Sequence, residues 1–154
     1  MTPLVQRAAR SSCTLGRVGE VRDLSSARSA RSGAADHELR LPAERHAPRI
    51  ARHWVMRTAA AAGVVGPLNQ VIEVLTAELV ADVVRTGDPD GVVRIGLRVA
   101  DDAVRVTVTA SVPLSPAPPN PASLALVEVL STSWGTRPHG DGERTVWFDV
   151  AIAS

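Results

Sequence analysis

The octapeptide Glu78-Leu-Val-Ala-Asp82-Val-Val-Arg85 combines an apolar face and a charged face in one stretch. Its two carboxylates and its arginine are spaced i, i+4, i+7, which on a helix lines them along one flank. Its apolar residues continue a stripe with the spacing of a helix that packs on a core. This stripe comprises Leu68, Val71, Ile72, Leu75, Leu79 and Val83. The stretch therefore predicts a helix that covers a core and presents charged groups at its edge.

Two helices are predicted in succession here. The one that carries the octapeptide begins near Pro67, a residue favoured in a first turn, and ends before Gly87. The preceding helix is predicted over 47–62, and Gly63 suits its C-terminal cap because glycine readily adopts positive φ. Within that first helix, Ile50, Trp54, Val55 and Thr58 keep helical spacing.

Alternating stretches predict strands around these helices. Apolar and polar residues alternate along 93–99 and 104–110, on either side of a turn at 101–102, so one side of this hairpin is expected to be buried. The glycine-rich segment 140–142 predicts a second hairpin turn. The five predicted strands are 38–41, 93–99, 104–110, 134–138 and 144–152.

Five prolines between residues 111 and 121 predict a stiff loop, because proline fixes φ and lacks an amide donor. A third helix is predicted over 122–131, with Leu124, Val127 and Leu130 buried. The order strand, two helices, two strands, helix, two strands predicts a two-layer α+β sandwich, in which three helices cover one face of a mixed, mostly antiparallel sheet.

Composition bounds the organisation and the class of protein. Residues 1–36 are rich in arginine and serine and poor in large apolar side chains, so we expect a disordered tail followed by one domain over 37–154. A net charge of +1 gives no reason to expect direct nucleic-acid binding. The single cysteine, Cys13, and the lack of an apolar run of about 20 residues favour a soluble cytoplasmic protein with no membrane contact.

The octapeptide resembles the helix that carries the N-box of GHKL ATPases, the Bergerat-fold family, and especially of bacterial anti-sigma-factor serine/threonine kinases. Two further stretches are similar to that family. Residues 124–127 and 134–138 resemble the helix and strand after the nucleotide lid, and residues 142–148 resemble the closing strand. The resemblance covers roughly residues 38–150 and implies the histidine-kinase-like ATPase fold.

The resemblance also implies roles for individual residues. Glu78 would be the catalytic base, and Asp82, at the position of the family's asparagine, would hold Mg²⁺. Arg85 would lie near the phosphates of ATP and Thr145 near adenine. The implied cofactors are ATP and Mg²⁺. The implied partners are a sigma factor, an anti-anti-sigma antagonist protein, or both, together with a second copy in a homodimer.

Several positions depart from the family pattern. Ala110 stands where the family has the aspartate that accepts a hydrogen bond from adenine, and a methyl group cannot accept it. The lid glycines are replaced by the segment 121–123, whose proline has no amide hydrogen. The helix that begins there could still offer the amides of Ser123 and Leu124 to an anion. The nucleotide motifs are thus degenerate.

Two functions from different classes follow. The first is an ATP-binding, Mg²⁺-dependent serine/threonine kinase that controls transcription by partner switching. The second is a nucleotide-free member of the same fold that acts purely as a protein-binding module. Without the resemblance, the same helix residues would be interpreted as a solvated face with an Asp82–Arg85 ion pair.

Overall fold

The computed structural model describes residues 36–113 and 120–152. The predicted tail, residues 1–36, lies outside the described residues except for Asp36, where the first strand begins. The middle of the predicted proline-rich loop, residues 114–119, also lies outside them. The helices described include none that is both long enough and apolar enough to cross a bilayer.

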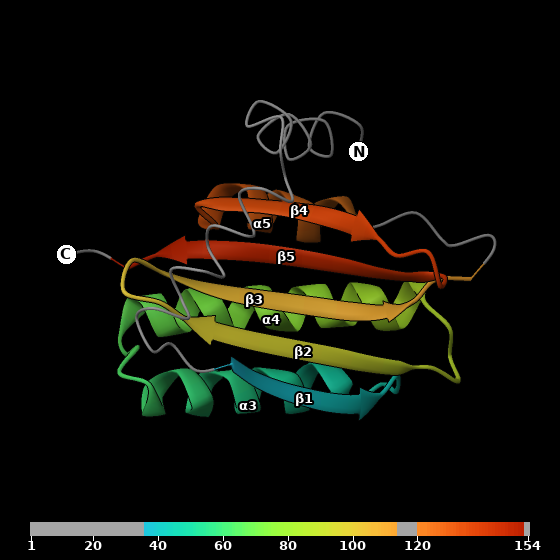
Figure 1. Ribbon diagram of the computed structural model, residues 1–154, viewed down its shortest axis with the longest axis horizontal. Coiled ribbons are helices and arrows are strands. Elements are labelled where there is room, and N and C mark those ends of the chain that lie inside the picture. The colour runs from blue at the N-terminus through green and yellow to red at the C-terminus, as the bar shows by residue number, and fades with distance from the viewer. Residues whose placement is uncertain (1–35, 114–119, 153–154) are drawn as a thin grey trace.

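The described residues form a five-stranded sheet whose strand order is β1-β2-β3-β5-β4, with three helices on one side of it (Figure 1). All four neighbouring strand pairs are antiparallel. The predicted two-layer α+β sandwich is therefore confirmed. In chain order the elements are β1 (Asp36–Pro42), α3 (Ala47–Ala61), α4 (Pro67–Thr86), β2 (Val92–Val99), β3 (Ala103–Ser111), α5 (Pro121–Leu130), β4 (Ser133–Pro138) and β5 (Glu143–Ala151).

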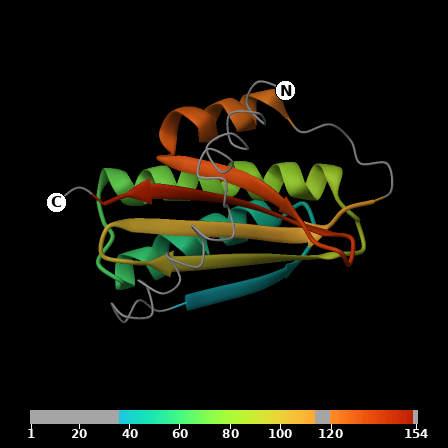
Figure 2. The ribbon, with the colours of Figure 1, turned by 45° about the horizontal axis from the view of Figure 1, so that its top comes forward.

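The third helix, α5, is a crossover connection. β3 and β4 both pair antiparallel with β5, so they run parallel to each other with β5 between them. Parallel strands cannot be joined by a tight turn, so the chain must cross the face of the sheet between them. α5 makes this crossing and packs against α4 and β4, as the tilted view shows (Figure 2). The topology thereby brings the first turn of α5 to the flank of α4.

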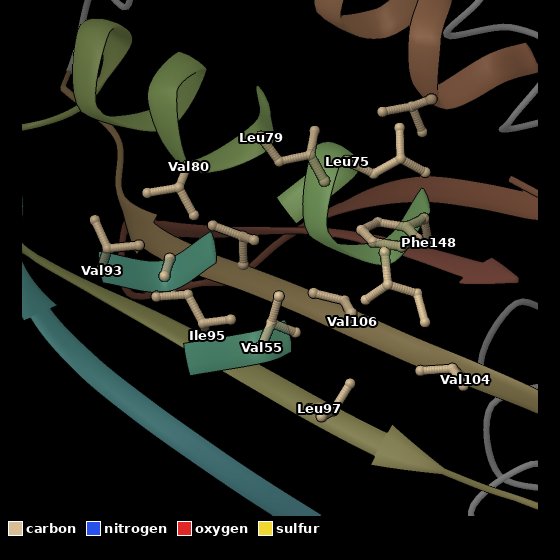
Figure 3. Packing of buried hydrophobic residues seen from close by; sticks show 14 of the residues in the cluster. Val55, Leu75, Leu79, Val80, Val93, Ile95, Leu97, Val104, Val106 and Phe148 are labelled. Atoms are coloured by element: carbon tan, nitrogen blue, oxygen red, sulfur yellow. The ribbon is translucent and has the colours of Figure 1, made fainter. Parts of the chain in front are cut away.

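The core lies between the helices and the apolar side of the sheet. Figure 3 shows Val55 of α3 and Leu75, Leu79 and Val80 of α4 facing the strands. The strand residues beneath them are mostly β-branched and are fully or almost fully buried, as the predicted alternation requires. They include Val93, Ile95, Leu97, Val104, Val106 and Phe148.

α3 packs on the core through small residues instead of its large ones. Its buried positions are Ala47, Ala51, Val55 and Ala59, a stripe with i, i+4 spacing. Ile50 is 44% exposed and Trp54 is only half-buried, although both keep helical spacing with the core. Alanines let α3 approach α4 and the sheet closely, and this rotates the larger apolar side chains toward the outer edge of the helix. The third helix, α5, also differs from the sequence prediction, since Leu130 is exposed and Ser123 is buried.

The turn between α3 and α4 depends on one buried amide side chain. Gly63 has φ +90°, as predicted for the helix end, and Gly66 has φ +71° before Pro67. The side-chain amide of Asn69 donates to the carbonyl of Val64 at 2.8 Å and to that of Met56 at 3.0 Å. These bonds satisfy two backbone acceptors where the chain reverses.

We therefore expect Asn69→Ala to lower the free energy of unfolding by about 2 kcal/mol, because the buried carbonyl of Val64 and the partly buried carbonyl of Met56 lose their hydrogen bonds to this side chain. Denaturant unfolding of the full chain would measure the change. The neighbouring exposed residue provides a control, since Gln70→Ala should change stability by less than about 0.5 kcal/mol. Equal effects of the two substitutions would contradict a special role for Asn69.

Candidate functional site

The two carboxylates of the octapeptide lie on the flank of α4 that faces α5. The Glu78 carboxylate accepts a hydrogen bond from the Ser123 hydroxyl at 2.9 Å. Asp82 accepts one from the backbone amide of Asn120 at 2.9 Å and forms an ion pair with Arg85 at 2.7 Å. Both carboxylates are half-buried, and Ser123 is buried. The sequence-predicted Glu78, Asp82, Arg85 and Ser123 are thus brought together at one place.

The first turn of α5 is built from donors that this chain already uses. Asn120 is the N-cap, and its side chain accepts a hydrogen bond from the amide of Ala122 at 3.0 Å. Pro121 follows and has no amide hydrogen. Negative charge near a helix N-terminus is stabilised by the exposed amides and the helix dipole. Glu78 and Asp82 supply that charge here, so they hold α5 against α4.

Leu124 and Ala110 lie at the apolar boundary of this region. Leu124 is buried in the core, one turn into α5. Ala110 stands near the end of β3 on the side of the sheet that faces the helices, as the predicted register required, and only 7% of it is exposed. Its methyl group belongs to the hydrophobic core, and the residue next to it on β5 is Arg144. An arginine offers only donors, so it cannot replace a carboxylate as an acceptor.

The structure does not bring Thr145 to this region. Along β5, Val146, Phe148 and Val150 face the helices, so Thr145 faces the opposite side of the sheet. There its hydroxyl is hydrogen-bonded to that of Thr109 at 2.7 Å and to Nε2 of His139 at 2.8 Å. Thr145 also lines a small polar depression of about 220 Å³ on that face. The sheet thus separates Thr145 from Glu78 and Asp82.

Arg144 also lies on the helix side of β5, beside Ala110, and the sequence interpretation missed it. Strand parity could have found it, because residues 144, 146 and 148 must share a face if Phe148 is buried. Trp147, by the same parity, lies on the open face. Its ring is stacked under the guanidinium of Arg105 at 4.4 Å and packs on Gly135, so only 8% of it is exposed.

Comparison with solved structures reveals one informative likeness. The chain is similar to the crystal structure of the RsbU and RsbW domains of Rv1364c from Mycobacterium tuberculosis, with a TM-score of 0.63 and 21% sequence identity. The match covers 78% of this chain but only 34% of that protein. No protein-family model and no curated protein matches this chain. The likeness shows that this chain shares its fold with part of that protein, which agrees with the α+β sandwich expected from the sequence.

The contacts in this region can be tested against what ATP and Mg²⁺ would require. Phosphate needs donors, yet the amides of Asn120, Ala122 and Leu124 and the hydroxyl of Ser123 are engaged with acceptors of this chain, and of the two amides predicted for an anion only that of Ser123 has no acceptor among the described residues. Mg²⁺ needs hard oxygen ligands, and Asp82 is neutralised by Arg85 and bonded to Asn120. Among the described residues, no three acidic, histidine or cysteine side chains cluster as metal ligands. The residues, as arranged here, do not fit Mg-ATP.

The anchoring role of Asp82 can be measured as stability. We expect Asp82→Ala to lower the free energy of unfolding by about 1 kcal/mol, because the first turn of α5 loses a charged acceptor. The control is Glu38→Ala, which removes a carboxylate from an exposed ion pair with Arg40 and should cost only a few tenths of a kcal/mol. An Asp82→Ala protein as stable as the wild type would show that this contact does not hold α5.

Proposed function

We propose that this protein is a regulatory domain of the anti-sigma-kinase type that works without nucleotide, by binding a protein partner. The partner is a sigma factor or the antagonist protein that competes with it, and the outcome is control of transcription by partner switching. One observation carries the proposal: Glu78 and Asp82, which the family resemblance assigns to catalysis and to magnesium, are hydrogen-bonded to the first turn of α5.

The balance of donors and acceptors supports this proposal. Binding of a triphosphate would have to replace the acceptors of the Asn120 amide and the Ser123 hydroxyl, and it would place phosphate charge beside the two carboxylates. Each broken hydrogen bond to a charged group costs about 1.5 to 3 kcal/mol unless a new partner restores it. Closure of α5 on α4 therefore opposes nucleotide binding in this conformation.

The region around Ala110, where the resemblance would place adenine, also supports a function without nucleotide. Adenine presents an amino group that needs an acceptor, and Ala110 provides only a methyl group. The residue paired with it, Arg144, carries a cation with donors alone. Arg144 is exposed to solvent, so it keeps hydrogen bonds to water, but it cannot supply the acceptor that the amino group needs. Both ends of an adenine nucleotide would thus meet groups of the wrong hydrogen-bonding type.

A kinase is the second candidate, and one contact favours it. The Glu78 carboxylate lies 2.9 Å from the hydroxyl of a serine, which is the contact that a general base makes with a substrate hydroxyl. In such an enzyme the substrate serine would take the place of Ser123. α5 would have to detach from α4 before ATP could bind.

Calorimetric titration of the full chain with ATP and Mg²⁺ distinguishes the two functions. We expect no heat of binding up to about millimolar nucleotide, the range in which a binding free energy falls to about 4 kcal/mol. Saturable binding that requires Mg²⁺ and is lost in Asp82→Ala would overturn the nucleotide-free proposal and favour the kinase. Retained folding of the variant is checked by circular dichroism.

The regulatory half of the proposal has its own test. Purified sigma factors and antagonist proteins from the source organism are paired with this protein, with and without ATP. We expect one of them to bind with the same affinity in both conditions and to bind Glu78→Gln equally well. Binding that needs ATP, phosphorylation of the antagonist, or no binding to any member of either class would contradict the proposal.

A further inference from the structure

A large groove lies between α3 and β1, at the edge of the sheet remote from α5. Its volume is about 1050 Å³, and β1 is the outermost strand on this side. Figure 1 shows α3 running behind β1 along this edge. The apolar floor includes Leu39 of β1 together with Ile50 and Trp54 of α3. Ile50 is the side chain of this set that the alanine stripe of α3 leaves exposed, whereas Leu39 and Trp54 also pack partly against the core.

The rim of the groove is basic. Arg49, His53 and Arg57 project from α3 with i, i+4, i+8 spacing and line one side of it. Neither arginine has a hydrogen-bonded or ion-paired partner among the described residues, and no carboxylate lines the groove. α3 therefore presents two parallel stripes, one apolar and one basic. On a helix the basic stripe spans about 12 Å.

This pattern decides between the occupants that such a groove could accept. A twofold contact joins the same surface of both copies, so a second copy would bring no carboxylate to the rim, because none lines the groove. The arginines of both copies would then enter one interface without acidic partners, which opposes association. An amphipathic helix with one apolar stripe and one acidic stripe would instead match both stripes of α3, packing large side chains into the groove and pairing carboxylates with the rim.

We propose that the groove between α3 and β1 binds an acidic amphipathic helix of a partner protein. The inference deepens the proposed function, because it assigns a surface and a chemistry to partner binding. The apolar contacts with Ile50 and Trp54 supply most of the affinity. The rim residues Arg49 and Arg57 select acidic partners and speed their association, an effect that weakens as salt screens the charges.

The probe is a synthetic, fluorescein-labelled helical peptide of about 18 residues, a length that exceeds the rim stripe. Leucines form its apolar stripe and glutamates the neighbouring stripe, and a matched peptide carries lysines in place of the glutamates. Fluorescence anisotropy with the full-length protein measures affinity, without nucleotide. We expect the acidic peptide to bind at least about tenfold more tightly than the basic one, with the difference shrinking between about 0.05 and 0.3 M salt.

Matched substitutions identify the groove as the binding surface. We expect Arg57→Glu to weaken binding of the acidic peptide about tenfold, whereas Arg137→Glu, on the other face of the sheet, has no effect. Ile50→Ser should also weaken binding. Val129→Ser should not, although Val129 on α5 is more exposed than Ile50. Circular dichroism of each variant checks that the exposed substitutions leave the fold intact.

Three results would overturn the inference. The first is equal affinity for the acidic and basic peptides, or no binding of either up to about millimolar concentration. The second is binding that is insensitive to both Arg57→Glu and Ile50→Ser. The third is a dimer in sedimentation velocity that Ile50→Ser dissociates, since the groove would then hold a second copy. None of these results depends on ATP, so they are separable from a failure of the nucleotide-free proposal.

Discussion

Burial of a single apolar side of the sheet under α3 and α4 is the interaction on which the other features depend. Val93, Ile95, Val106 and Phe148 are fully buried on that side, and removing such side chains from water is the main favourable term in folding. Because the described helices all lie on one side of the sheet, the strands alternate, and their residues of opposite parity face away from the helices. The face on which each polar residue stands is therefore fixed by the core. Thr145, one residue before the inward Val146, has no access to the helix side.

The same burial forces the crossover that creates the carboxylate contact. β3 and β4 flank β5, so the chain must leave the sheet after β3 and return at its far side. α5 is short, and its first turn exposes amides that need acceptors. Glu78 and Asp82 occupy the flank of α4 where the start of α5 arrives. Asp82 accepts a hydrogen bond from the amide of the N-cap residue Asn120, and Glu78 accepts one from the side-chain hydroxyl of Ser123. A pair of acidic residues that the family resemblance assigns to ligand chemistry here has a structural contact as its immediate partner.

The fold could be predicted from the sequence because its signals are local and periodic. Alternation in the hairpin strands, the proline before α4 and the glycine after α3 each determine an element without reference to the rest of the chain. What could not be predicted depends on contacts between elements. The side of α3 that packs inward is set by how closely α4 approaches, so four small residues are buried and Ile50 is turned outward. The pairing of Glu78 with Ser123 joins residues far apart in sequence and follows only from the crossover. Thr145 is different, since its outward parity relative to Phe148 was available from the sequence alone.

Under the proposed function, a protein with α5 fixed in this way exchanges partners by a different physical route. A nucleotide regulates binding only if it stabilises one of two conformations more than the other. If the α4 carboxylates hold α5 closed and no triphosphate competes for its donors, a nucleotide cannot regulate partner binding in this way. Partner choice then depends on competition for one surface, decided by the concentrations and affinities of the competitors. An apolar stripe beside a basic stripe suits such competition, because apolar contacts can serve several helices while charge discriminates among them. Under the proposed function, the exposed position of Ile50 on α3 and the closure of α5 on α4 are complementary, because the first offers an apolar contact to a protein partner and the second opposes nucleotide binding.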